Sequence, residues 1–385
     1  MSSNNHYPNS RRQFLRQAAL TSAAATISGA AVALPFSAEA TRQDDNQRKI
    51  GFAIVGLGKY ATEQMMPAFK ESKHCKIVAL VSGTPDKAQR LAKEYGVDAK
   101  SIYNYQNFDS IKDNPAVEVV YVVLPPSLHA EYTIRAAQAG KHVLTEKPMA
   151  PSVEDCQRMI DACRKAGKQL MVAYRAQFEP FNLDAISRIR KGELGKLRFV
   201  TSDHGRQVQP TKDKADEWRV VKKLAGGGSL MDIGIYSLNA ARYLTGEEPV
   251  EVSAMESTDR SDPRFKEVED QVHFTLRFPS GTLATCTSAY SIEGVKRFRV
   301  FGADAWLDLD PATDYYRHNM TIGKAEGELK TSMKEGNQFA SMIDHMAESV
   351  MQNKTPKTPG EEGLRDIKLI LAIYESAKKG RSVKV

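Results

Sequence analysis

Five short apolar runs, separated by segments with helical spacing, constrain the fold of residues 49–171 more than any other feature of the sequence. The runs are apolar almost without interruption, whereas the segments between them repeat apolar residues every three or four positions. This alternation indicates a parallel sheet with helices on both faces. We therefore predict a doubly wound α/β domain that binds its ligand at the carboxyl ends of the strands. The strand-like runs are residues 50–58, 76–83, 117–125, 142–148 and 169–174.

A different pattern follows residue 175. Strand-like runs are joined by short turns, and helical patterns occur near 180–191 and 228–245 and again in the tail. We predict an α+β domain with a large, mostly antiparallel open sheet. Association through the face of this sheet would give a homodimer or a homotetramer. The strand-like runs are residues 197–205, 249–256, 270–278, 281–290, 297–302 and 305–310.

The N-terminal segment, residues 1–40, resembles an export signal. Arg11 and Arg12 form a twin arginine, a weakly apolar stretch runs over residues 18–36, and Ala38-Glu39-Ala40 is a cleavage-type site. The alternative is a transmembrane anchor, but the stretch is barely long enough and contains Gly, Ser and Thr. We expect a cleaved twin-arginine signal, recognition by the twin-arginine export machinery, no stable membrane anchoring and a periplasmic mature protein.

Composition excludes two classes of function. The formal net charge is +7, yet no cluster of Lys and Arg interleaved with aromatic residues occurs, so nucleic acid is not an expected partner. The four cysteines match neither a disulfide framework nor a zinc site, which indicates buried free thiols and no metal.

The first strand-like run ends in a dinucleotide-binding turn. Gly56, Gly58 and Ala61 fit the pattern G-x-G-x-x-A, with Lys59 and Tyr60 between them. The first glycine permits a tight turn, the second lets the backbone approach a diphosphate, and the alanine lets the helix pack close to the strand. The pattern is specific here because it follows a strand and opens a helix.

The end of the second strand indicates which dinucleotide binds. An NAD site usually has a carboxylate there, but this chain has Ser82, and Lys87 follows one helical turn later. A hydroxyl and an ammonium accommodate a 2′-phosphate, which a carboxylate would repel. We therefore predict NADP. The alternative for Lys87 is a solvated helix position.

Two further segments contain residues suited to proton transfer. Glu146 and Lys147 lie at the end of a strand of the nucleotide domain, and Asp232 and Tyr236 are four residues apart in a helical pattern. Separately these residues have ordinary structural explanations. Together with a nucleotide fold they supply a cation, a carboxylate and a phenol beside a hydride site.

The chain resembles the glucose–fructose oxidoreductase and inositol dehydrogenase superfamily. The resemblance covers essentially the whole chain after the signal, and it depends on five motifs that occur in order. These are IVGLGKYA, LVSG, EKPMA, AGGGSLMDIGIY and DPATDYY.

The resemblance implies a role for each residue of the reacting centre. Lys147 would polarise the sugar hydroxyl or carbonyl, Asp232 would hold the substrate or orient the acid/base, and Tyr236 would be the general acid/base. Many members carry histidine where this chain has Tyr236, and the tyrosine indicates the sugar–sugar oxidoreductase branch. A free phenol titrates near 10, so Tyr236 needs a nearby cation to act as a base.

Other cavity residues are implied by the same resemblance. Tyr174 and Tyr316 would contact the substrate, and Arg175 would contact the substrate or the nicotinamide. The cofactor site would include Gly56, Gly58, Lys59, Tyr60, Ser82, Lys87, Leu124, Pro125, His129, Glu146, Lys147 and Arg175. For Tyr174, Arg175, His129 and Tyr316, a packing or surface role is the alternative.

The first hypothesis for the function is an NADP-holding sugar oxidoreductase, which oxidises a glucose-like aldose to its lactone and reduces a second, fructose-like sugar to the alditol. A twin-arginine signal favours it, because the route exports folded proteins and free NADP is not expected outside the cytoplasm. The second is a dissociating dehydrogenase or reductase of sugars, inositols or anhydro-sugars, since the arm lacks the proline of related enzymes. The third is a sugar sensor without catalysis.

The sequence divides into five predicted parts. They are the twin-arginine signal (1–40), an N-terminal arm (41–49), the NADP-binding Rossmann domain (50–174), an α+β substrate and oligomerisation domain (175–335) and C-terminal helices that pack back on the core (336–385).

Overall fold

The computed structural model describes residues 48–385. The predicted export signal and nearly all of the predicted arm lie outside the described residues. Within residues 48–385, no helix combines the length and the apolarity needed to cross a membrane.

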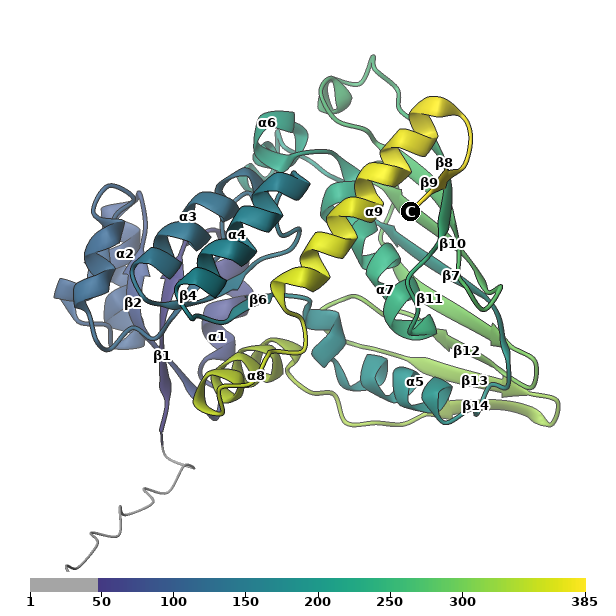
Figure 1. The fold of residues 1–385 in the computed structure, drawn as a ribbon, viewed down its shortest axis with the longest axis horizontal. Coiled ribbons are helices and arrows are strands. Elements are labelled where there is room, and N and C mark those ends of the chain that lie inside the picture. The colour runs from purple at the N-terminus through teal and green to yellow at the C-terminus, as the bar shows by residue number, and fades with distance from the viewer. Residues whose placement is uncertain (1–47) are drawn as a thin grey trace, which may run out of the picture. The chain divides into compact units, whose positions relative to one another are not determined.

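The first domain is built on sheet A, which has six parallel strands in the order β3-β2-β1-β4-β5-β6 (Figure 1). Its central strand β1 is buried along its whole length, as a strand covered on both faces must be. The doubly wound prediction is confirmed. The strands are β1 (Ile50–Val55), β2 (Cys75–Val81), β3 (Ile102–Tyr103), β4 (Val119–Val122), β5 (His142–Thr145) and β6 (Leu170–Val172).

The helices of this domain begin and end at residues with a clear local preference. Helix α2 starts with Pro85 at its first position and ends at Gly96, which has a left-handed φ of 67°. In α4 the side chain of Ser152 accepts a hydrogen bond from Asp155 N. The helices are α1 (Met66–Ala68), which continues a π-helical turn η1 (Ala61–Met65), then α2 (Pro85–Tyr95), α3 (Pro126–Gln138) and α4 (Val153–Lys165), with 3-10 turns η2 (Ala99–Ser101) and η3 (Phe108–Asp113).

The second domain is built on sheet B, which has nine strands in the order β14-β13-β12-β11-β7-β10-β9-β8-β15. Only β7 and β10 pair in parallel, so the prediction of a mostly antiparallel sheet is confirmed. The strands are β7 (Leu197–Gly205), β8 (Glu251–Ser257), β9 (Gln271–Arg277), β10 (Leu283–Ala289), β11 (Val295–Gly302), β12 (Trp306–Leu309), β13 (Met320–Lys324), β14 (Gly327–Thr331) and β15 (Val383–Lys384).

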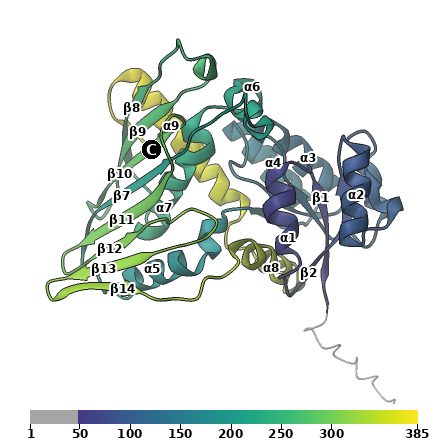
Figure 2. The same ribbon diagram turned by 180° about the vertical axis from the view of Figure 1, so that it is seen from behind.

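Helices cover one face of sheet B. Figure 2 shows α5 and α7 on the side of the sheet that faces the first domain. The inward side chains of β7 and β10 pack under α7, whereas Phe199 and Leu283 on the opposite face are exposed. The helical segments are η4 (Arg175–Phe178), α5 (Pro180–Arg190), η5 (Lys214–Val220), α6 (Lys222–Ala225), the π-helical turn η6 (Leu230–Gly234), α7 (Ile235–Thr245) and η7 (Pro263–Phe265).

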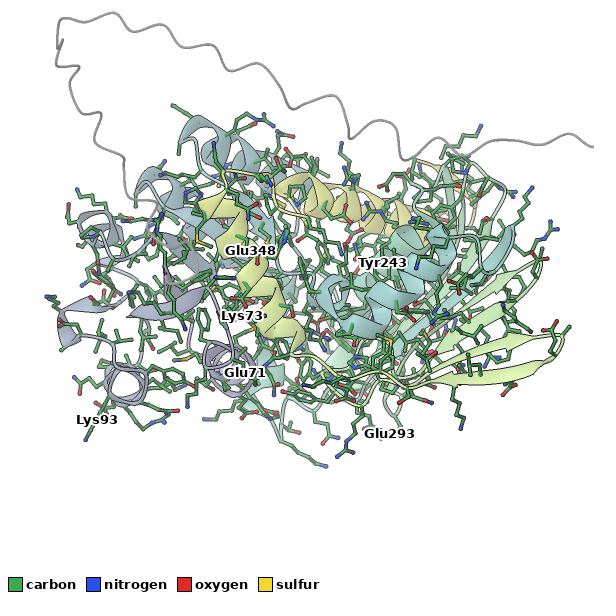
Figure 3. The ribbon with its side chains drawn as sticks, turned by 90° about the horizontal axis from the view of Figure 1, so that it is seen from below. Glu71, Lys73, Lys93, Tyr243, Glu293 and Glu348 are labelled. Carbon is green, nitrogen blue, oxygen red and sulfur yellow. The ribbon has the colours of Figure 1, made fainter. Side chains whose placement is uncertain are left out.

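The last two helices return to both sheets. Helix α9 (Gly360–Lys379) packs on β8 and also contacts α4 and β6 of the first domain. Helix α8 (Gln338–Met351) lies against the segment before β2, where Asp344 accepts hydrogen bonds from Lys73 N and His74 N at 3.0 and 2.9 Å. In Figure 3, Glu71, Lys73 and Glu348 are labelled beside this helix. All four cysteines are buried free thiols, as their spacing indicated.

Candidate active site

A cavity of about 590 Å³ lies at the carboxyl ends of β1, β2, β4 and β5 and extends to sheet B. This is the edge at which a doubly wound sheet binds its ligand. Eight of its lining side chains are cationic and two, Glu146 and Asp232, are carboxylates, so the cavity favours an anionic ligand. The cations are Lys59, Lys87, Lys147, Arg175, Arg206, Lys214, Arg219 and Lys296.

The turn after β1 has the geometry of a diphosphate cradle. Gly56 has a φ of 94°, and a Cβ there would lie 2.2 Å from the main-chain oxygen of Val123, so only glycine fits. A Cβ on Gly58 would meet no atom within 4 Å, so the backbone is open to the cavity at this point. Lys59 and Tyr60 also line the cavity, and the following helix directs its N-terminus there. These residues fit a dinucleotide.

The end of β2 fits a phosphorylated ribose. Ser82 accepts a hydrogen bond from Thr84 N at 3.0 Å, and Lys87 Nζ donates to the main-chain oxygen of Leu57 at 3.2 Å. This contact holds the Lys87 ammonium between the glycine turn and the end of β2. Neither carboxylate of the cavity lining follows β2; Asp86, in the first turn of α2, does not line the cavity.

Asp232 is the centre of a charged cluster that joins the two domains. Lys147 Nζ, just after β5, donates to the main-chain oxygen of Asp232 at 2.6 Å and lies 3.3 Å from its Oδ1. The other carboxylate oxygen accepts from Arg219 Nε at 2.9 Å and from the Tyr290 hydroxyl at 2.8 Å. Burial alone would raise the pKa of Asp232, but Arg219 and Lys147 hold it well below its usual value. Asp232 is therefore a permanent carboxylate, not a proton donor.

Tyr236, at the start of α7, lies close to two cations. Lys147 Nζ is 4.7 Å and Arg175 Cζ 4.9 Å from its ring centroid. The ring of His204, an inward residue of β7, stacks on it at 4.8 Å. Burial, followed by the charges of Lys296, Arg175 and Lys147, holds the pKa of His204 well below its usual value, so this imidazole is neutral at neutral pH. The phenol thus has cations on one side and an uncharged ring beside it.

Arg175 is a buried positioning group as well as a cavity residue. Its guanidinium donates to the main-chain oxygens of Thr313 and Asp314 at 2.6 and 3.0 Å, and to Gln338 Oε1 at 2.7 Å. Burial favours a lower pKa for Arg175, but Tyr236 and neighbouring phenols outweigh it and raise the pKa. The charge therefore stays on Arg175, over the ring of Tyr236.

The remaining predicted cofactor residues lie in or behind the cavity wall. Leu124, Pro125 and Glu146 line it. Glu146 accepts a hydrogen bond from the Tyr121 hydroxyl, and burial raises its pKa. His129 does not line the cavity: it is fully buried, with ring nitrogens 2.7 Å from Leu124 O and 2.9 Å from Pro148 O. Its effect on a cofactor is indirect, through the wall that it supports.

Two predicted substrate contacts need correction. Tyr174 is buried away from the cavity, beside the carboxylate of Asp366. Tyr316 is 52% exposed outside the cavity, where its hydroxyl donates to Gln64 Oε1. Neighbouring residues of a chain point in different directions, and it is Arg175 and Tyr315, one position away in each case, that line the cavity.

Several cavity residues have no motif that could reveal them. His204 belongs to no motif, although its partner at 2.9 Å, Thr313, lies in DPATDYY 109 positions away. Arg206, Trp218 and Arg219 come from a segment with little regular structure. The one available signal was the alternation along β7, which places His204 on the buried face with Val200 and Ser202.

Comparison with known proteins agrees with the two-domain fold. A family model described as "Oxidoreductase family, NAD-binding Rossmann fold" matches residues 50–174, and one described as "Oxidoreductase family, C-terminal alpha/beta domain" matches residues 186–385. The chain is 30% identical over 348 residues to the NADP(+)-type D-xylose 1-dehydrogenase of Haloarcula marismortui, covering 89% of this chain and 95% of that protein.

Two further similarities extend the comparison. The 1,5-anhydro-D-fructose reductase of Ensifer adhaerens is 26% identical over 87% of this chain and 98% of its own length. Among solved structures, the aldose-aldose oxidoreductase of Caulobacter crescentus, complexed with glycerol, is 50% identical with a TM-score of 0.85, covering 88% of this chain and 100% of that chain.

Proposed function

The chain belongs to the oxidoreductase family that combines an NAD-binding Rossmann fold with a C-terminal alpha/beta domain, and from this premise we propose that it is an NADP-dependent sugar oxidoreductase with a retained cofactor. It oxidises an aldose to its lactone and returns the hydride to a second sugar without releasing the dinucleotide. This is the first of the hypotheses raised by the sequence.

One observation carries the proposal: the ring of Tyr236 lies within 5 Å of the charged groups of both Lys147 and Arg175, at the wall of a cavity that begins at the glycine turn. The two cations can stabilise negative charge that develops on a sugar oxygen beside the phenol, and the hydroxyl of Tyr236 is a group that can exchange a proton with that oxygen. A sugar sensor without catalysis would not need this arrangement.

The chemistry assigns each side chain a step. When bound, NADP supplies the carbon that accepts the hydride from C1 of the aldose. Tyr236 takes the proton of the C1 hydroxyl, Lys147 stabilises negative charge on that oxygen, and the ionised Asp232 holds Lys147 in place. In the second half Tyr236 donates the same proton to the carbonyl oxygen of the second sugar. Hydride and proton are thus both returned, and the enzyme ends each cycle unchanged.

The relatives support a sugar substrate and leave two forms of the cycle to distinguish. The 50% identical structure is of an aldose-aldose oxidoreductase, which favours an aldose in both halves. The sequence motifs favoured a fructose-like acceptor. The dehydrogenase relative favours the alternative function, a conventional dehydrogenase that exchanges its cofactor.

Export is part of the same proposal. The twin arginine at Arg11 and Arg12 would send the folded protein, with its cofactor, to the periplasm. An enzyme there has no pool of free NADP to draw on, so a second sugar must reoxidise the bound NADPH.

The test uses purified mature protein with no nicotinamide added. After gel filtration, the absorbance of bound cofactor should remain. Glucose should produce the near-ultraviolet band of NADPH, and a second sugar, fructose or an aldose, should remove it. Protein that elutes without nucleotide, and turns over only when NADP is supplied, would establish the exchanging dehydrogenase instead.

A further inference from the structure

The cavity is closed on one side by residues 206–220, a segment of the second domain that includes η5. Arg206, Lys214, Trp218 and Arg219 of this segment line the same cavity as the glycine turn. We propose that residues 206–220 form a clasp over the dinucleotide, and that the ion pair between Asp213 and Lys59 is the latch that slows its release. The proposal rests on the proposed function, because it explains how the cofactor would be retained.

The latch joins the two domains at the glycine turn. Lys59 Nζ lies 2.7 Å from Asp213 Oδ2, across 154 positions of sequence. The other carboxylate oxygen, Oδ1, accepts from Ala215 N at 3.0 Å and so caps η5. Because the Asp213 carboxylate both binds Lys59 and caps η5, the start of η5 is fixed to the residue that follows Gly58. The hydrogen bond with Lys59 raises the pKa of the ammonium and lowers the pKa of Asp213, so the pair is ionised at neutral pH.

A chain of alternating charges fixes the other end of the clasp to the reacting centre. Arg206 Nη2 lies 2.7 Å from both carboxylate oxygens of Asp216, and Arg219 Nη1 is 3.2 Å from Asp216 Oδ1. Arg219 then reaches Asp232 at 2.9 Å, and Asp232 contacts Lys147. These buried and half-buried pairs are the stronger anchor, since exposed pairs contribute little.

The latch and the chain of charges have different roles within the clasp. The exposed latch is weak enough to open, whereas Asp216 and Arg219 hold the base of the segment. Arg219 is a positioning residue, because it acts on the substrate through the carboxylate of Asp232. If the clasp opens far enough to separate Arg219 from Asp232, the position of Lys147 changes as well. The closed clasp and the active arrangement of the reacting centre are therefore coupled.

The charge of the segment supports this assignment. Lys214 and Arg206 line the cavity from the second domain, and Gly58 lines the same cavity from the first. A diphosphate between them would meet cations on one side and main-chain N–H groups on the other. An uncharged or cationic ligand would gain nothing from this closure.

The experiment measures the rate at which bound NADP leaves the purified holoenzyme, by its transfer to an excess of a second NADP-dependent enzyme. Asp213→Asn removes the charge but keeps an N-cap acceptor, so the fold is retained. We expect release about three- to fivefold faster than from the unaltered protein, as an exposed pair allows. Added salt should speed release from the unaltered protein more than from this variant.

Glu217→Gln is the matched control, because it removes the same charge from an exposed position of the same segment, away from the cavity lining. Its release rate should equal that of the unaltered protein. An equal acceleration by Glu217→Gln would mean that net charge, not the latch, governs release.

Lys59→Met, alone and combined with Asp213→Asn, separates the latch from direct phosphate binding by Lys59. If the latch exists, Lys59→Met accelerates release less in the Asp213→Asn background than alone. Equal effects in both backgrounds, or Asp213→Asn with unaltered release, would overturn the clasp. An unaltered protein that loses its NADP on gel filtration would instead contradict the proposed function, so the two failures are distinct.

Discussion

At the scale of single residues, the reacting centre depends on which groups can change their charge. Asp232 stays ionised and His204 stays neutral, because their surroundings hold each pKa far from neutrality. Lys147 and Arg175 are the cations that face the phenol. Tyr236 is therefore the group in the cluster best suited to exchange a proton with a sugar.

Replacing Tyr236 with phenylalanine tests this assignment. The ring keeps its packing against His204 but loses the exchangeable proton, so we expect the rate of NADPH formation with aldose to fall about 10²- to 10⁴-fold. Bound NADP should be retained. Tyr243→Phe on the same helix is the control, because the hydroxyl of Tyr243 donates to Asn182 away from the cavity (Figure 3). Unaltered turnover in Tyr236→Phe would exclude the phenol as acid/base.

Lys87 tests the preference for NADP. Lys87→Ala removes an ammonium at the predicted 2′-phosphate position, so affinity for NADP should fall about ten- to a hundredfold while affinity for NAD changes little. Titration of protein stripped of nucleotide measures both. Lys93→Ala lies on the same helix outside the cavity and should change neither (Figure 3). An equal loss of affinity for NAD would mean that Lys87 contacts a part of the ligand other than the 2′-phosphate.

Motifs reveal residues whose roles are local. Gly56 and Gly58 follow from the turn that they form, and Lys147, Asp232 and Tyr236 were indicated by family motifs. Arg219 and His204 were not predicted, because neither belongs to a motif and the alternation along β7 indicates that His204 is buried but not which residue it contacts. Tyr174 and Tyr316 were predicted one position from the cavity residues, since a motif gives position along the chain but not side-chain direction.

At the scale of elements, most strands with a buried face were predictable. Strand β13 is an exception, since it buries Met320 and Ile322 and was still not expected. Strand β14 was not expected either, and all five of its residues are at least partly exposed. A polar edge strand has no apolar periodicity to detect. The segment 206–220 was likewise unassigned: Val208 and Val220 pack into a small apolar cluster, but they are twelve positions apart and show no periodicity, and ion pairs supply the other contacts.

The turn between β1 and η1 contains a matched pair of glycines. Gly56→Ala should destabilise the protein by about 1–3 kcal/mol, since alanine is strained at a positive φ and its Cβ would strike the backbone of Val123. Gly58→Ala has room for its Cβ, so stability should hold while NADP binding weakens. Thermal unfolding and nucleotide content give the two readouts. A loss of stability in Gly58→Ala as large as that in Gly56→Ala would contradict the open space beside Gly58.

The junction of β5 and β6 should be sensitive to acid. His142 Nδ1 accepts a hydrogen bond from Gln169 N at 2.9 Å, and burial lowers the pKa of His142 to about 4. The unfolded chain, with a pKa near 6.5, binds the proton more readily. Stability from this site is therefore complete above about pH 6.5 and is lost as the pH falls towards 4. His142→Asn keeps an acceptor, so its melting temperature should fall less between pH 7 and 5.

At the scale of the whole molecule, we expect self-association through the face of sheet B that no helix of residues 48–385 covers. Phe199 and Phe301 stack at 4.2 Å on this face, and Phe199 is 43% exposed. Phe199→Lys should shift the assembly towards monomer in light scattering, because an ammonium would be buried against an apolar face. Leu371→Lys, on the exposed side of α9, should leave the mass unchanged. A monomeric unaltered protein would remove the basis for this prediction.

The fold class of both domains was predictable because it depends on periodicity. The ion pair of Lys59 with Asp213, 154 positions away, had no sequence signal, whereas the meeting of Lys147 with Asp232, 85 positions away, was indicated by the family motifs.

That contact has a consequence for protein engineering. The hydrogen bond from Lys147 to Asp232 means that the reacting centre is a seam shared by two halves of the chain. A hybrid that joins the nucleotide half of one relative to the sugar half of another would inherit both binding surfaces and still lack a working centre unless the seam matched. Changes of substrate in this protein should therefore come more readily from loops around the seam than from exchange of a whole half.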